Sequence, residues 1–179
     1  MQFRELHRDE IECRISTINE KGLSLLLYKD ARCDMNILDE VVGSENWQRT
    51  HEVVNGNLFC NLGININYAV PSKPAEWVWK QDVGTESYTE KEKGQASDSF
   101  KRACFNWGIG RELYTAPFIW INVSDCNIKE VKGKKVCYDK FYVEDIAYEN
   151  KKIVALSIKN RSTSRRVFFM DNRAKAKGA

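Results

Sequence analysis

The alternating stretch between Trp47 and Tyr68 constrains the fold more than any other feature of the chain. Residues 47–54 have the two-residue period of a strand, and Asn55-Gly56 is the strongest two-residue signal for a β-hairpin. The segment that follows alternates cleanly, with apolar residues on one side and Asn or Gly on the other. The apolar side consists of Leu58, Cys60, Leu62, Ile64, Ile66 and Tyr68. An antiparallel sheet with one buried face requires this pattern.

The next segments supply a third strand and a helix to cover the buried face. Residues 76–83 (EWVWKQDV) are predicted to form the strand, and residues 90–114 an amphipathic helix that ends at Gly108 and Gly110. The apolar stripe of this helix consists of Ala96, Phe100, Ala103, Cys104 and Trp107. We therefore predict an α+β fold with a β-β-β-α core, in which a curved antiparallel sheet is covered by a basic helix.

The flanking segments carry weaker patterns. We predict a short helix at 5–16, a short apolar strand or extended segment at 23–28, and a second helix at 31–42 that begins after Asp30 and ends at Gly43. Beyond Pro117 we expect a small β-meander that either extends the main sheet or forms a satellite lobe, with strands at 136–148, 153–160 and 165–170. The predicted organisation is a core at 1–120, a β-meander extension at 121–172 and a disordered basic tail at 173–179.

Composition and charge narrow the functional classes. No apolar run approaches the ~20 residues that cross a bilayer, and the charged N-terminus MQFRELHRDEIECR is unlike a secretory signal. The six cysteines stand singly, which favours reduced thiols in a cytosol. Residues 1–100 hold 11 Lys and Arg against 17 Asp and Glu, whereas residues 101–179 hold 17 against 8. This split favours either a polyanionic partner for the basic half or head-to-tail contact between subunits.

Motifs for covalent chemistry are weak. The segment GIGRE at 108–112 lacks the lysine-hydroxyl pair of a Walker A loop, so ATP-driven chemistry is disfavoured. Acidic residues are plentiful and leave a metal-dependent nuclease open, although no spacing singles out a site. These residues are Asp30, Asp34, Asp39, Glu40, Asp82, Glu86, Glu90 and Glu92. We predict a protein without catalytic residues, metal or other cofactor.

Cations interleaved with aromatic residues remain as the strongest chemical signal. Lys91, Lys93, Lys101, Arg102 and Arg111 lie in the same segment as Phe105, Trp107 and Tyr114. Single-stranded nucleic acid is bound by this combination, because cations follow the phosphates and rings stack on the bases. Two plainer interpretations stay open, namely that Arg102 pairs with Asp98 on a solvated helix face and that Trp107 belongs to the core.

Three motifs carry a resemblance to a known family. The runs VVGSENW at 41–47, DVGTES at 82–87 and GQASDSFKRACFNWGIGRELY at 94–114 resemble the Rad-fifty-two family of single-strand annealing proteins, and in particular its phage, Sak-type branch. The similarity covers residues 5–120. It implies ATP-independent annealing of complementary DNA strands in homologous recombination and DNA repair. It also implies a phage or prophage origin, the cytoplasm of a bacterial host, and no membrane partner.

The resemblance further implies an oligomeric ring with a groove for single-stranded DNA. Besides this DNA and other copies of the chain, a single-strand-binding protein is an expected class of partner. Lys101 and Arg102 match the family's Lys-Arg pair in the groove, and Asp98 matches the acid that precedes it. The alternatives are a metal-dependent nuclease and a non-catalytic oligomeric adaptor on the same fold.

The sequence departs from the family pattern at two positions. Phe105 stands where a further arginine is expected one turn after the pair, which exchanges a phosphate contact for stacking. An arginine expected near the start of the second helix falls on Cys33 in strict register, and Arg32 is its neighbour. The predicted DNA-binding set is Lys101, Arg102, Arg32, Lys93, Lys80, Arg111 and Phe105.

Overall fold

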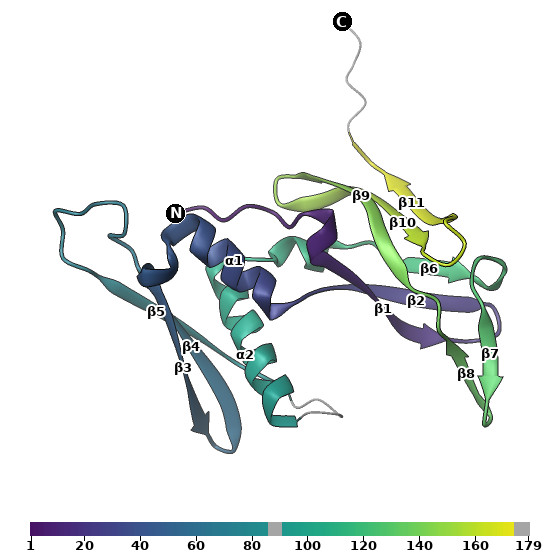
Figure 1. The fold of residues 1–179 in the computed structure, drawn as a ribbon, viewed down its shortest axis with the longest axis horizontal. Helices are drawn as coiled ribbons and strands as arrows, with labels where there is room; N and C mark the ends of the chain where they lie inside the picture. Colours follow the sequence, from purple (N-terminus) through teal and green to yellow (C-terminus); the bar gives the residue numbers. More distant parts are fainter. Residues whose placement is uncertain (86–90, 174–179) are drawn as a thin grey trace, which may run out of the picture. The chain divides into compact units, whose positions relative to one another are not determined.

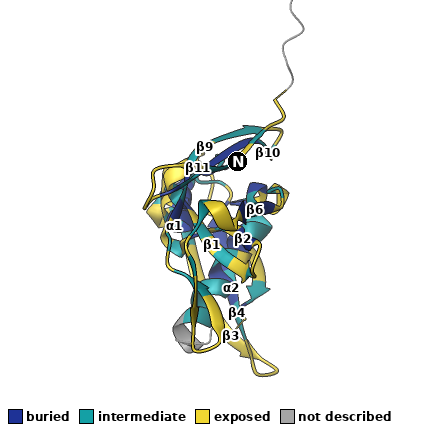
Figure 2. Cartoon of the chain, turned by 90° about the vertical axis from the view of Figure 1, so that its right-hand side faces the viewer, coloured by how far each residue is buried: buried dark blue, intermediate teal, exposed yellow. Residues whose placement is uncertain are grey.

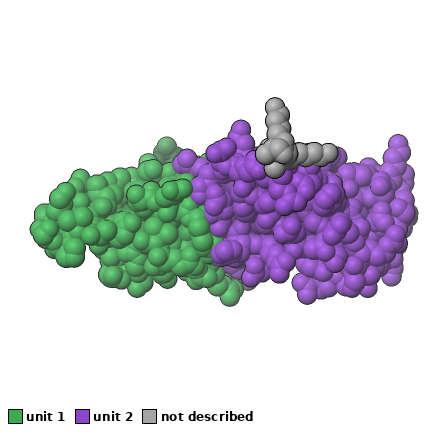
Figure 3. Space-filling model, turned by 90° about the horizontal axis from the view of Figure 1, so that it is seen from above, with its two compact units in different colours: residues 1–4, 31–110 green, residues 5–30, 111–179 purple. Residues whose placement is uncertain are grey.

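The computed structural model describes residues 1–85 and 91–173, without the side chains of residues 91–93. It divides into two compact units, which are drawn in different colours in Figure 3. Unit 1 comprises residues 1–4 and 31–110, and unit 2 comprises residues 5–30 and 111–179. This division differs from the predicted one at residue 120, because the first strands of the chain pair with its C-terminal strands.

Unit 1 contains the predicted three-stranded antiparallel sheet. Its strands are β3 (Trp47–Val54), β4 (Asn57–Asn65) and β5 (Trp77–Val83), in that spatial order. The β3–β4 hairpin turns at Asn55 and Gly56, whose φ angles are 51° and 78°. Positive φ at both central residues is what the Asn-Gly signal predicts for a two-residue hairpin.

The alternation along β4 is confirmed only in part, because Gly63 and Asn65, on the other face from Leu62 and Ile64, are buried as well. Cys60, Leu62 and Ile64 are 0% exposed on the face that packs under a helix. The predicted strand is nevertheless too long, because β4 ends at Asn65 and Ile66 is 41% exposed. The edge strand β3 is exposed along nearly its whole length (Figure 2).

Two α-helices complete unit 1. α1 (Ala31–Val42) has the predicted bounds. It buries Cys33, Asp34, Ile37, Leu38 and Val42. α2 (Lys91–Trp107) packs on β4 and β5 (Figure 1) and ends at the predicted glycine stop, where Gly108 takes a φ of 102°. The α+β class and the β-β-β-α arrangement of the core are confirmed.

Unit 2 is built on one six-stranded antiparallel sheet with the spatial order β11-β10-β9-β1-β2-β6. Its strands are β1 (Ile11–Ile18), β2 (Gly22–Lys29), β6 (Ile119–Asn122), β9 (Phe141–Glu149), β10 (Lys152–Asn160) and β11 (Arg166–Asp171). β7 (Ile128–Val131) and β8 (Lys134–Cys137) form a separate two-stranded sheet. The 3-10 helices of the chain are η1 (Arg8–Glu10), η2 (Ser44–Asn46), η3 (Arg111–Thr115) and η4 (Val123–Asp125).

The predicted helix at 5–16 is wrong. The segment contains η1 and then β1, which pairs with β2 along its length and with β9 at Glu12. Ile11, Cys13 and Ile15 are the less exposed positions of β1, and they repeat with a period of two. Hydrogen bonding to a strand on each side therefore makes residues 11–18 a β-strand, although their sequence carries a sparse helical pattern.

The predicted β-meander exists as β9, β10 and β11, which are neighbours in chain order. It does not extend the sheet of unit 1, and it is no satellite lobe, because β9 also pairs with β1. The predicted strand at 136–148 is two strands, β8 and β9, with residues 138–140 between them. Of the predicted tail, only Arg173 lies within the described residues.

All six cysteines are free thiols. Among the described residues, no helix combines the length and the apolar character needed to cross a bilayer.

Candidate nucleic-acid interface

The core packing of α2 determines which of its side chains are available to a ligand. Phe100, Ala103 and Cys104 are 0% exposed, and the Trp107 indole Nε1 donates a hydrogen bond to the Leu62 carbonyl oxygen on β4 at 3.2 Å. The predicted apolar stripe is therefore confirmed, and Trp107 belongs to the packed side of the helix. Residues at intermediate helical angles, including the Lys-Arg pair, remain on the flank and the outer side.

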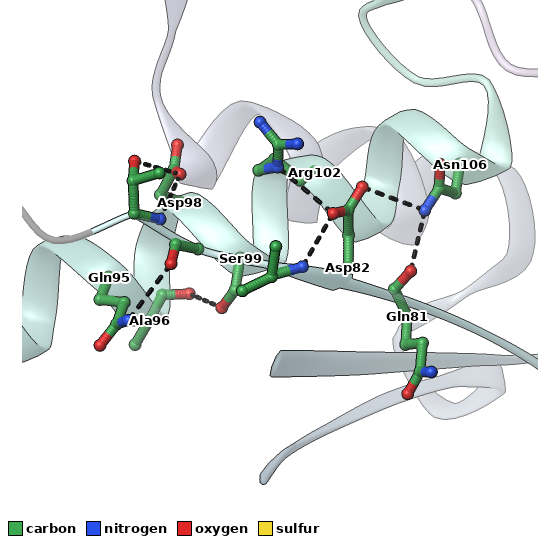
Figure 4. Close-up of polar contacts among 11 residues, drawn as sticks. Gln81, Asp82, Gln95, Ala96, Asp98, Ser99, Arg102 and Asn106 are labelled. Atoms are coloured by element: carbon green, nitrogen blue, oxygen red, sulfur yellow. Dashed lines mark hydrogen bonds and ion pairs between the residues drawn. The ribbon is translucent and has the colours of Figure 1, made fainter. Parts of the chain in front are cut away.

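A glycine allows α2 to approach the chain after β5 closely. A Cβ on Gly84 would lie 2.1 Å from the Gln95 carbonyl oxygen and 2.7 Å from the Ser99 backbone nitrogen. The Gln95 amide donates to the Gly84 carbonyl oxygen at 3.2 Å, and the Ser99 hydroxyl donates to the Ala96 carbonyl oxygen at 2.9 Å (Figure 4). The N-terminal half of α2 is thereby fixed against β5.

Arg102 pairs with Asp82 of β5, and not with Asp98. Its Nε lies 3.3 Å from Asp82 Oδ1, its side chain is 46% exposed, and its two terminal nitrogens point away from Asp82 (Figure 4). Asp98 instead accepts hydrogen bonds from the Thr85 backbone N–H and hydroxyl, both at 3.0 Å. The alternative interpretation, in which Arg102 pairs with Asp98, is thus wrong, because β5 and the loop after it supply partners for both side chains.

Asp82 is well satisfied without Arg102. It also accepts from the Asn106 amide at 3.3 Å and from the Val83 backbone N–H at 2.8 Å. The Asn106 amide donates in addition to the Gln81 carbonyl oxygen at 2.9 Å (Figure 4). This network holds the Arg102 side chain in place and leaves its terminal nitrogens directed outward.

Lys101 is half-buried on α2. Within the part of the chain that the structure describes, its ammonium group makes no hydrogen bond or ion pair. Phe105 follows one turn later on the same side of the helix and is also half-buried. The pair and Phe105 therefore form one short row of cationic and aromatic groups.

Lys80 has a structural role at the end of α2. Its Nζ donates to the Asn106 carbonyl oxygen at 2.9 Å and lies 4.5 Å from the centre of the Trp107 ring. A cation at the C-terminal turn complements the helix dipole. Lys80 is exposed and lies near the Arg102 network, but its ammonium group is already engaged.

The other predicted cations lie on α1, in the first turn of α2 and on η3. Arg32 is exposed on α1. The neighbouring Cys33, which aligns with the family's arginine in strict register, is buried in the core. Lys93 lies in the first turn of α2, and its side chain is outside the described residues. Arg111 is exposed at the start of η3 and belongs to unit 2.

Arg49 is a cation of unit 1 that the sequence interpretation missed. Its guanidinium lies 4.4 Å from the centre of the Phe100 ring, and it belongs to β3, the edge strand opposite to β5, which carries Asp82. Burial raises the pKa of Cys60, which faces this side of the sheet, to about 11 despite the nearby Arg49 charge. The two-residue period of β3 could have revealed Arg49, because it shares a face with Trp47.

Among residues 1–85 and 91–173, no cluster of three or more His, Cys, Asp or Glu side chains is arranged to hold a metal ion. The site provides the exposed guanidinium of Arg102 beside the ammonium group of the half-buried Lys101 on α2. Such groups bind phosphates.

The comparisons with known proteins add no assignment, since no protein-family model, no curated protein and no solved structure matches the chain.

Proposed function

We propose that this protein binds single-stranded DNA and anneals complementary strands without ATP, as an oligomer acting in homologous recombination and DNA repair. The observation that carries the proposal is the Lys101–Arg102 pair on the outer side of α2. Lys101 has no partner among the described side chains, and the terminal nitrogens of Arg102 point away from Asp82. The motif similarity of residues 94–114 supports the same function.

The proposed mechanism needs no bond making or breaking. Lys101 and Arg102 neutralise phosphates of the bound strand, and the counterions released from the DNA favour binding. Contacts to the backbone leave the base edges free, because phosphate contacts carry no sequence information. Holding a strand extended with its bases exposed lowers the entropic cost of pairing it with a complement.

Phe105 adds an aromatic group one turn beyond the pair. In the proposed complex, a nucleobase stacks against its exposed edge, which is worth roughly 1–3 kcal/mol per base in single-strand binding proteins. The packed position of Trp107 removes it from this role, because its indole N–H is bonded to the sheet.

The proposal includes assembly into a ring through unit 1. Within the described residues, β3 and β5 are the two edges of a three-stranded sheet, so each has one side open to pairing with a strand of another copy. The charge argument for head-to-tail contact is weaker than the sequence halves indicated. Unit 1 holds 9 Lys and Arg against 11 Asp and Glu, and unit 2 holds 19 against 14.

The test is annealing by the purified chain. Two complementary oligonucleotides labelled with a fluorophore and a quencher are mixed with the protein, without ATP or divalent metal. We expect a pairing rate well above the protein-free rate, together with oligomers by light scattering and single-strand affinity that falls steeply with salt. A pairing rate equal to the protein-free rate would overturn the proposal.

The same reactions separate the alternatives. Loss of a labelled single strand only when Mg²⁺ or Mn²⁺ is added would identify a nuclease. Oligomers without any DNA binding at low salt would identify an adaptor.

A further inference from the structure

The two-stranded sheet of β7 and β8 is a distinct feature of unit 2 (Figure 1). We call it the ribbon, comprising residues 128–137. Its register runs from Ile128 opposite Cys137 to Val131 opposite Lys134. The turn between the strands has positive φ at Lys132 (49°) and Gly133 (74°), as a tight two-residue hairpin requires.

The base of the ribbon is fastened to the main sheet of unit 2. Asp139 accepts from the Asn127 backbone N–H at 2.9 Å and from the Asn160 amide at 2.8 Å. Asn160 ends β10 and is 0% exposed. Burial on its own raises the pKa of Asp139, but the hydrogen bonds from Asn127 and Asn160 outweigh it and hold that pKa below its usual value. A two-stranded hairpin is marginally stable alone, so this connection gives the ribbon a fixed base.

The ribbon concentrates uncompensated positive charge. It carries four lysines and one acid, Glu130. All four lysine side chains are exposed, and none makes an ion pair or hydrogen bond with another described side chain. The lysines are Lys129, Lys132, Lys134 and Lys135. Other cations of unit 2 behave differently: Lys159 and Arg166 both pair with Glu144, at 2.6 and 2.8 Å.

The lysines are sorted between the two faces of the ribbon. Lys129 and Lys134 share one face with Val131 and Val136, because residues opposite each other in the register point the same way. This face contains no acid. Lys135 lies on the other face, directly opposite Glu130. One face of the ribbon therefore presents two cations beside a small apolar surface.

We propose that the ribbon binds duplex DNA, with its lysines on the phosphates and its strands directed into the major groove. The major groove of B-DNA, about 12 Å wide, admits a two-stranded β-ribbon. Lysine contacts to phosphates position such a ribbon without reading sequence. The duplex binding stands on the ribbon alone, and only its role rests on the proposed function, in which the ribbon retains the annealed product.

The test is a charge-removing triple variant, Lys129→Gln, Lys134→Gln and Lys135→Gln, in the full chain. Lys132 is left unchanged because of its positive φ. Binding to a mixed-sequence duplex and to a single strand of equal length is measured by fluorescence anisotropy at several salt concentrations. We expect duplex affinity to fall about tenfold, with a salt slope shallower by roughly one unit for each contact removed. Single-strand affinity should change far less.

Two matched variants complete the experiment. Lys21→Gln, Lys73→Gln and Lys152→Gln remove the same charge from exposed positions elsewhere and should leave duplex binding unchanged. Lys129→Arg, Lys134→Arg and Lys135→Arg should preserve it. Duplex affinity that is unchanged in the ribbon variant, or that falls equally in the control, would overturn the proposal.

Two further results separate this proposal from its neighbours. Equal, ribbon-dependent binding to vesicles containing phosphatidylserine would contradict the commitment to duplex DNA. The double variant Lys101→Ala and Arg102→Ala should lose single-strand binding and keep duplex binding. If the ribbon variant keeps duplex binding while the double variant loses single-strand binding, the ribbon proposal fails and the proposed function still stands. If the ribbon variant loses duplex binding while the double variant keeps single-strand binding, the duplex-binding proposal stands without the proposed function.

Discussion

Arg102 on α2 and the lysines of the ribbon are held in different ways. Arg102 is oriented by Asp82, and beside it Lys80 of β5 donates to the Asn106 carbonyl oxygen. On the ribbon, the lysines extend from exposed strands and make no ion pair with another described residue. An oriented guanidinium favours one path of a phosphate backbone, whereas flexible ammonium groups act as point charges that tolerate many. In the two proposals, the α2 site therefore positions single-stranded DNA, whereas the ribbon retains duplex DNA without fixing its path.

The orientation on α2 depends on the core beneath it, so breaking that core should have the largest effect. Phe100 is 0% exposed, stacks on Trp47 with ring centres 6.0 Å apart, and lies under the Arg49 guanidinium. We expect Phe100→Ala to lower the free energy of unfolding by ~3–5 kcal/mol through the cavity it leaves. Urea denaturation followed by tryptophan fluorescence measures this loss.

The matched control is Phe169→Ala on β11, where the ring is 61% exposed. We expect its free energy of unfolding to stay within about 0.5 kcal/mol of the wild type. Equal losses in the two variants would show that α2 is not packed as described.

The close packing of α2 against Gly84, directly after β5, allows a test with a smaller and more local effect on stability. Gly84→Ala places a methyl group against the backbone of Gln95 and Ser99, which cannot move without shifting the helix. We expect a loss of about 1–3 kcal/mol, typical of overpacking. In Gly63→Ala the nearest atoms are those of the Trp79 indole, a side chain that is 45% exposed and not backbone, so the loss should be smaller. Denaturation midpoints in the reverse order would contradict this packing.

Unit 2 contains a different kind of ion-pair site, in which two cations pair with one acid. Glu144 accepts from Arg166 at 2.8 Å and from Ser157 at 2.6 Å, and lies 2.6 Å from Lys159. Hydrogen bonds from Arg166, Lys159 and Ser157 lower the pKa of Glu144 from 4.5 to about 2. Because the folded pKa is depressed, the stabilisation is complete above pH 4.5 and is lost as the pH falls towards 2.

Hydrogen exchange of the β9 and β10 amides as a function of pH tests this linkage. We expect protection in the wild type to fall between pH 4.5 and about 2 as Glu144 gains its proton. Glu144→Gln should weaken protection at neutral pH and flatten its pH dependence in that window. A pH dependence identical in both proteins would rule out Glu144 as its source.

Local signals predicted the structure where local interactions decide it. The turn at Asn55-Gly56, the bounds of α1 and the buried stripe of α2 follow from turn chemistry and periodicity within a few residues. The first strand was mistaken for a helix because its structure depends on β2 and on β9, which lies more than 120 residues away. The units are interleaved for the same reason, and no local pattern encodes such pairing.

The site shows the same limit. Periodicity placed Lys101 and Arg102 off the apolar stripe, and the structure agrees. It could not identify Asp82 as the partner of Arg102, since the two lie 20 residues apart and meet only when α2 docks on β5. The engagement of Lys80 with the end of α2 was hidden for the same reason.

The central claim is that Lys101 and Arg102 hold the DNA, and annealing by the double variant Lys101→Ala and Arg102→Ala tests it most directly. Alanine suits a helix, and Asp82 keeps its bonds from Asn106 and Val83, so folding and oligomer size should survive. We expect slower annealing for every oligonucleotide sequence and a salt slope shallower by roughly two units. The control Lys21→Ala and Lys73→Ala, at exposed positions elsewhere, should anneal like the wild type. A folded, assembled Lys101→Ala, Arg102→Ala variant that anneals at the wild-type rate would contradict the claim.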